Sequence, residues 1–165
     1  MLSTTLREAI NEQIKHELNS AYLYLSMSAY CETLNLSGCA SWLRTQWQEE
    51  VGHGMKLFDM ITSRGGRVTL QGLDQPPSEF TSVHDVFKRV LAHEQKVTGL
   101  INDLYGLAVK EKDYAAQAEL QWFVTEQVEE EQTASSILAQ LEMIGESGAA
   151  LMMLDRQLGS RAAAP

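Results

Sequence analysis

The scarcity of proline constrains this chain more than any other feature of its sequence. Its 165 residues include three prolines, Pro76, Pro77 and Pro165, so residues 1–75 and 78–164 contain none. Proline inside a helix removes a hydrogen bond and clashes with the preceding turn, and both blocks are therefore open to long helices. Apolar residues recur through both blocks at the three- and four-residue spacing of a buried helical face. The pattern predicts an all-α fold.

Short polar or glycine-containing breaks divide this apolar pattern into separate helices. On the first of them, the apolar positions are Leu6, Ile10, Ile14, Leu18 and Leu25. The predicted long helices span about residues 4–33, 38–65, 82–110 and 114–144, and a shorter fifth helix spans about residues 147–158.

The connection at residues 66–81 is too long for a tight turn between helices. An extended connection of this length reaches ~53 Å, whereas a helix of about 28 residues is ~42 Å long. The second and third predicted helices can therefore run parallel, joined by a crossover along the bundle. The sequence predicts a four-helix bundle with one long crossover loop and a short fifth C-terminal helix, in a single domain of residues 1–165.

The two halves of the chain repeat one another. A shift of 77 residues superimposes Glu17 on Glu94, Glu49 on Glu126, Glu50 on Gln127, and His53 on Glu130. Each half is then a helical hairpin with one acid on its first helix and a polar pair, one turn apart, on its second. Two such hairpins packed together bring these groups to one level of the bundle.

The repeated acids favour a metal site. Glu17 and Glu94 each lie near the apolar stripe of their helix, where a carboxylate is costly unless it is paired or bound to a metal. Together with Glu50 and Glu130 they place four carboxylates beside the single imidazole of His53, and two divalent cations would balance that charge. Oxygen-rich ligation with one imidazole suits iron or manganese better than structural zinc.

Each local motif has a plainer alternative. Glu50 with His53 alone, or the acidic run at residues 129–131 alone, is typical of a solvated helix face. The 77-residue register favours the metal site, because it relates groups that no local helix rule connects. A non-catalytic bundle with structural carboxylates, serving as an assembly or interaction module, is a further alternative.

The overall charge limits the partners. The chain has 22 acidic against 13 basic residues, a net charge of −9, which argues against nucleic acid or an anionic membrane and is compatible with cations. No apolar run approaches the roughly 20 residues of a membrane span, and no secretory signal is visible. Cys31 and Cys39 form neither a disulfide framework nor a CxxC motif, so we expect reduced thiols and a cytoplasmic location.

Glu17, the EEVGH of residues 49–53, Glu94 and the EQVEE of residues 126–130 closely resemble the pattern of the bacterial non-haem ferritins. The resemblance runs from about residue 2 to 159. It implies an iron-storage protein with ferroxidase activity, which oxidises Fe(II) with O2 (H2O2 being a possible second oxidant) and deposits Fe(III) mineral inside a 24-subunit cage. The alternative within this resemblance is an oxidant-defence enzyme that consumes O2 or peroxide, with storage secondary.

The resemblance also implies individual roles. The ligands of a first iron are Glu17, Glu50 and His53, and those of a second iron are Glu50, Glu94 and Glu130, with Gln127 hydrogen-bonding beside the pair. A third iron site comprises Glu49, Glu126 and Glu129. Tyr24 matches a tyrosine that can supply an electron, and Trp122 lies near the place of an aromatic neighbour, although ordinary core packing would also explain both.

Three differences from related families limit what the resemblance implies about haem, a rubrerythrin-like peroxidase and the route of iron entry. Val51 stands where bacterioferritins carry their haem-binding methionine, so the resemblance implies iron without haem. No CxxC segment of the rubrerythrin kind is present. Gln117 and Leu120 stand where animal ferritins line their three-fold pores with acids, so no iron entry route is assigned.

Overall fold

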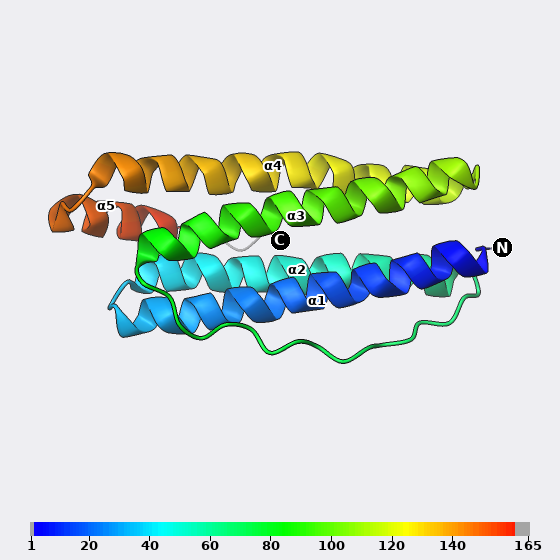
Figure 1. Ribbon diagram of the computed structural model, residues 1–165, viewed down its shortest axis with the longest axis horizontal. Helices are drawn as coiled ribbons and strands as arrows, with labels where there is room; N and C mark the ends of the chain where they lie inside the picture. Colours follow the sequence, from blue (N-terminus) through cyan, green and yellow to red (C-terminus); the bar gives the residue numbers. More distant parts are fainter. Residues whose placement is uncertain (1, 161–165) are drawn as a thin grey trace.

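The computed structural model describes residues 2–160, and the chain there folds into five helices (Figure 1). They are α1 (Thr4–Thr33), α2 (Ser37–Ser63), α3 (Val83–Lys110), α4 (Tyr114–Ile144) and α5 (Gly148–Gly159). The predicted all-α fold is confirmed, and every predicted helix end lies within two residues of the observed one. Met1 and residues 161–165 of the predicted single domain lie outside the described residues. Among residues 2–160, no helix is both long and apolar enough to cross a membrane.

Local side-chain chemistry explains where the helices begin. The first backbone N–H groups of a helix have no partner inside it, and a serine or aspartate before the helix can accept from one of them. Four of the five helices start in this way, with Ser3, Ser82, Asp113 and Ser147 as the capping residues. At the other end of α4, Gly145 has a φ of 55°, a left-handed conformation that glycine adopts without a side-chain clash.

The helices form two antiparallel hairpins, α1–α2 and α3–α4 (Figure 1). The crossover between α2 and α3 runs along the length of the bundle beside α1, so α2 and α3 point in the same direction. Its course confirms the predicted long crossover. Asn11 on α1 helps to hold the crossover, since its side-chain oxygen accepts from the backbone N–H of Thr69 at 2.9 Å.

The core consists of two apolar clusters with a polar layer between them. One cluster lies toward the start of α2 and α3 and contains Met27, Leu43 and Phe87, among others. The second lies toward their other ends and contains Ile10 and Leu57, among others. Most of the buried side chains at the level between the two clusters are polar, and they come from all four long helices: Gln13, Glu17, Ser20, Gln46, Glu50, His53, Glu94, Gln127 and Glu130. The bundle therefore gives up apolar packing at its middle, where a group of charged residues takes its place.

The short helix α5 docks against the start of α2. Leu154 and Leu158 are buried there, and Asp155 accepts a hydrogen bond from the backbone N–H of Cys39 at 2.8 Å. Contact is close at Gly38, where a Cβ atom would lie 1.7 Å from the backbone carbonyl oxygen of Asp155. Any side chain at this position would therefore push the two helices apart.

We expect Gly38→Ala to lower the free energy of unfolding by about 2–4 kcal/mol, because the added methyl group meets backbone that cannot move aside without undocking α5. The matched control is Gly99→Ala on α3, where a Cβ atom would have no neighbour within 4 Å. Replacing glycine by alanine there should raise stability by about 0.5–1 kcal/mol. Urea unfolding of both variants measures the difference, and equal effects would show that the α2–α5 contact does not contribute to stability.

Candidate metal centre

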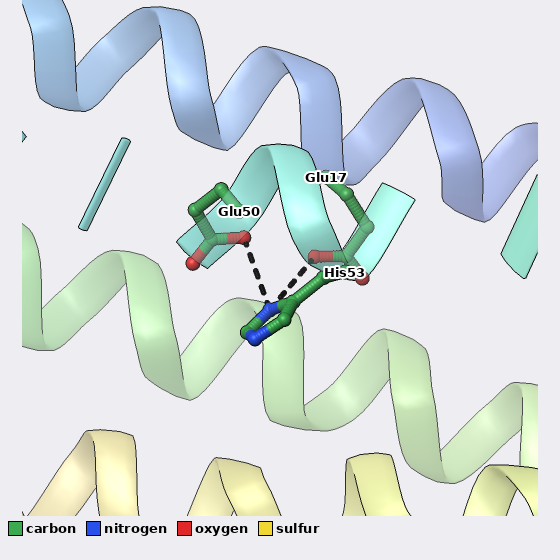
Figure 2. Close-up of side chains that lie close together, drawn as sticks. All are labelled: Glu17, Glu50 and His53. Carbon is green, nitrogen blue, oxygen red and sulfur yellow. Dashed lines mark ion pairs between the residues drawn. The ribbon is translucent and has the colours of Figure 1, made fainter. Parts of the chain in front are cut away.

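Three predicted ligands from α1 and α2 meet in the polar layer. Glu50 and His53 lie one turn apart on α2, and Glu17 faces them from α1 (Figure 2). The Nδ1 atom of His53 is 3.6 Å from Glu50 Oε2 and 3.8 Å from Glu17 Oε2. One ligand atom from each of the three residues lies within 4.8 Å of the other two, and all three side chains are buried.

The oxygen atoms that face His53 have no hydrogen-bond partner among the described residues. These atoms are Oε2 of Glu17 and Oε2 of Glu50, both fully buried. A buried carboxylate oxygen without a partner is costly. Ligand atoms bound to one cation at about 2.0–2.2 Å would be separated from one another by distances similar to those seen here. The unpartnered oxygens thus fit a cation held between the two carboxylates and the imidazole.

The second half of the bundle places further buried carboxylates near this group, but among the described residues the expected second set, Glu50, Glu94 and Glu130, does not converge as closely as the first. The hydroxyl of Tyr24 donates a hydrogen bond to Glu94 Oε1, and Gln127 Nε2 donates to Glu94 Oε2 at 3.1 Å. Glu130 lies close enough to Glu94 for their negative charges to interact. The predicted positions of Glu94, Gln127 and Glu130 are thus all buried beside the first group, on α3 and α4.

Two glutamines that were not predicted from the sequence donate hydrogen bonds to these carboxylates. Gln13 Nε2 donates to Glu17 Oε1 at 2.8 Å, and Gln46 Nε2 donates to Glu130 Oε2 at 3.0 Å. Each amide fixes one oxygen of its carboxylate, and at Glu17 the other oxygen, Oε2, faces His53. Their spacing in the sequence could have identified them. Gln13 lies four residues before Glu17, and Gln46 lies four residues before Glu50, so each shares a helix face with an expected ligand.

Burial raises the pKa values of all four carboxylates, and repulsion from another of the four adds to the rise at Glu17, Glu50 and Glu130. Desolvation is the largest cause at each. The charge of Glu50 adds to the effect at Glu17, and the charge of Glu94 adds to it at both Glu50 and Glu130. The pKa of Glu130 rises to about 7. Without a cation, the cluster therefore holds protons that ordinary carboxylates have lost at neutral pH.

We expect the metal-free chain to lose stability as the pH rises from 5 to 8. Glu130 binds a proton more tightly in the folded than in the unfolded chain, so its contribution is complete below pH ~4 and lost as the pH passes 7. For Glu130 alone the loss is on the order of 3 kcal/mol. Thermal unfolding in the presence of a chelator measures this dependence. Glu130→Gln should flatten it, and a melting temperature that rises from pH 5 to 8 would contradict the prediction.

The remaining predicted residues are less closely grouped. Glu49 is half-buried, and its negative charge raises the pKa values of Glu50 and Glu130. Glu126 is half-buried and Glu129 exposed on α4. Among the described residues, the carboxylates of Glu49, Glu126 and Glu129 do not converge as the first three ligands do. The third iron site stays a prediction.

Two aromatic rings cover the imidazole of His53. The ring of Trp122 lies edge-on to it at 5.3 Å between centroids, and the ring of Phe123 at 6.0 Å. Trp122 is itself 38% exposed, so it lies between His53 and solvent. Sequence reasoning placed Trp122 near the centre and did not identify Phe123, because the rotation of α4 against α2 cannot be read from either helix alone.

Known proteins with similar sequences are ferritins. Residues 7–144 match the family model of the ferritin-like domain. A bacterial non-heme ferritin of Bacteroides fragilis is 43% identical over 161 residues, which cover 98% of this chain and 100% of the relative. One from Staphylococcus haemolyticus is 39% identical over 161 residues, covering 98% of this chain and 97% of the relative.

Solved structures of ferritins have the same fold as this chain. An open pore ferritin from the hyperthermophilic archaeon Archaeoglobus fulgidus is 47% identical and superimposes with a TM-score of 0.97, covering 98% of this chain and 100% of that chain. A structure described as a humanized archaeal ferritin is 46% identical, with a TM-score of 0.99 and complete coverage of both chains.

Proposed function

This chain belongs to the ferritin family of iron-storage proteins, and from that premise we propose that it is a ferroxidase. It binds two Fe(II) ions per subunit in the polar layer of its bundle, and O2 oxidises them. The Fe(III) produced is deposited as mineral inside a cage of 24 copies, in the cytoplasm. Iron is the substrate and the stored cargo, and we propose no haem.

One observation carries this proposal: the buried carboxylates of the two hairpins face one another with too few positive charges to balance them. Glu17, Glu50, Glu94 and Glu130 are each at most 6% exposed, and His53 is the one imidazole among them. Two divalent cations would supply the missing charge. Glu50 suits the bridging position, because it faces His53 and also interacts electrostatically with Glu94 and Glu130.

The protein groups position the ions and exclude water from them. Each Fe(II) gives up one electron, so a pair supplies the two electrons that O2 takes up, with two protons, in forming H2O2. Gln13, Gln46 and Gln127 hold the carboxylates in place by donating hydrogen bonds. The apolar clusters on either side close the layer along the bundle axis. Glu49, Glu126 and Glu129 would bind a third iron close by.

Tyr24 would supply a further electron for the reduction of O2, its phenol becoming a radical as the hydroxyl proton leaves. It is fully buried, and its hydroxyl donates to Glu94, an expected ligand of the second iron. We expect Tyr24→Phe to leave the number of bound Fe(II) ions unchanged and to slow the later phase of oxidation, on the order of two- to tenfold. Anaerobic Fe(II) titration followed by stopped-flow oxidation separates the two effects. Loss of Fe(II) binding would instead show that Tyr24 has a structural role.

Core size distinguishes storage from the oxidant-defence alternative. Storage requires the assembled protein to take up far more iron than its binding sites hold, whereas a protein that chiefly consumes O2 or peroxide needs only those sites. We expect aerobic Fe(II) loading, followed by size separation and iron analysis, to yield a protein-bound mineral of hundreds of ions per cage. Retention of only about two or three ions per chain would favour the oxidant-defence alternative.

A further inference from the structure

The rings that cover His53 also form one wall of a surface cavity. The cavity has a volume of about 330 Å³ and lies between α2 and α4. Trp122 and Phe123 line it and both lie edge-on to the imidazole of His53, which is not among the lining residues. These two rings therefore separate the cavity from the expected ligands.

Two acidic side chains also line the cavity. Asp59 comes from α2 and Glu119 from α4, and both are exposed. Glu119 lies one turn before Trp122, so the carboxylate and the ring share a helix face. Carboxylates at the entrance of a concave surface raise the local concentration of cations. The cavity is thus suited to attract a divalent cation to the outer side of the rings.

A lysine restrains the outer ring. Lys56 follows His53 by one turn on α2, and its Nζ atom lies 4.4 Å from the centroid of the Trp122 ring. A cation over the face of a tryptophan ring stabilises the contact by about 0.5–1 kcal/mol at an exposed site. Trp122 is thus held between Lys56 and His53, which lie on the same face of α2. The Trp122 ring also packs against the ring of Phe123, at 4.9 Å between centroids.

We propose that this cavity is the passage by which divalent cations reach His53, with Trp122 as its movable closure. Asp59 and Glu119 attract the cation, and displacement of the Trp122 ring admits it to the ligands. Lys56 slows entry in two ways, since it holds the ring in place and repels an incoming positive charge. The inference rests on the proposed function, because it assumes that the buried carboxylates bind the cation once it has entered.

Anaerobic binding of Co²⁺ tests the passage without any oxidation step. Co²⁺ accepts imidazole and carboxylate ligands, and its visible absorption reports their binding. We expect Trp122→Ala to raise the stopped-flow binding rate roughly fivefold or more. Trp122→Phe, a milder change in case the alanine variant folds poorly, should raise it less, and Lys56→Met should also raise it. Lys88→Met, an exposed lysine on α3, serves as the charge-matched control.

The acidic entrance is tested in the same way. The double variant Asp59→Asn, Glu119→Gln should lower the rate by up to about tenfold at low salt and weaken its dependence on ionic strength. The number of Co²⁺ ions bound should not change in any of these variants. Wild-type rates in all of them, with binding intact, would overturn the passage and leave the proposed function standing. Co²⁺ binding that Glu50→Ala does not reduce would overturn both.

Discussion

Glu50→Ala is expected to slow the initial oxidation of Fe(II) by at least about a hundredfold. Glu50 is the one carboxylate that both faces His53 and interacts with the acids of the second hairpin. Its loss would remove a ligand from both irons, so the two electrons could no longer be drawn from one site. Stopped-flow absorbance after mixing Fe(II) with O2 measures the rate.

The isosteric variant Glu50→Gln separates this loss from a folding defect. It keeps the side-chain volume and removes the buried negative charge, so the metal-free chain should unfold at a higher temperature than wild type at pH 8 while oxidation is still lost. Glu8→Ala, which removes an exposed acid of α1, is the control and should behave as wild type. Rapid oxidation in both Glu50 variants would exclude Glu50 as a bridging ligand.

His53→Ala is expected to weaken binding of the first iron and to slow oxidation by about ten- to a hundredfold. His53 is the one imidazole among the expected ligands, and its Nδ1 atom faces the unpartnered oxygens of Glu17 and Glu50. The variant also leaves a space beneath Trp122, so some loss of stability should accompany it.

The matched control for this variant is His84→Ala. His84 is half-buried at the start of α3, with 45% of its side chain exposed, and it pairs only weakly with Glu142 at 3.9 Å. Isothermal titration of Fe(II) under anaerobic conditions should show one strong site fewer in His53→Ala and no change in His84→Ala. Equal stoichiometry and equal oxidation rates in the two variants would remove His53 from the centre.

The helices and their direction could be predicted from the sequence because local rules determine them. Proline-free blocks, apolar spacing and polar breaks set the helix ends, and the length of the crossover set the parallel course of α2 and α3. The 77-residue repeat also predicted that the polar groups of the two halves lie at one level of the bundle. Two hairpins with the same spacing of polar groups place these groups at equal heights when they pack together.

Features that depend on the exact rotation of one helix against another could not be predicted. Leu25 belongs to the apolar stripe of α1 by spacing, yet it is 37% exposed, because the buried face of α1 runs instead through Tyr24 and Ser28. The close contact of Gly38 with Asp155 depends on how α5 turns back onto the bundle. The covering of His53 by Trp122 and Phe123 depends on the facing of α2 and α4.

Stopped-flow oxidation of Fe(II) by O2, titrated from below one to many ions per chain, tests the ferroxidase centre most directly. We expect a fast phase that saturates at about two ions per chain, or about three if the third acidic site contributes, followed by slow mineralisation. Oxidation no faster than in protein-free buffer at every ratio would contradict a ferroxidase centre at Glu17, Glu50, His53, Glu94 and Glu130.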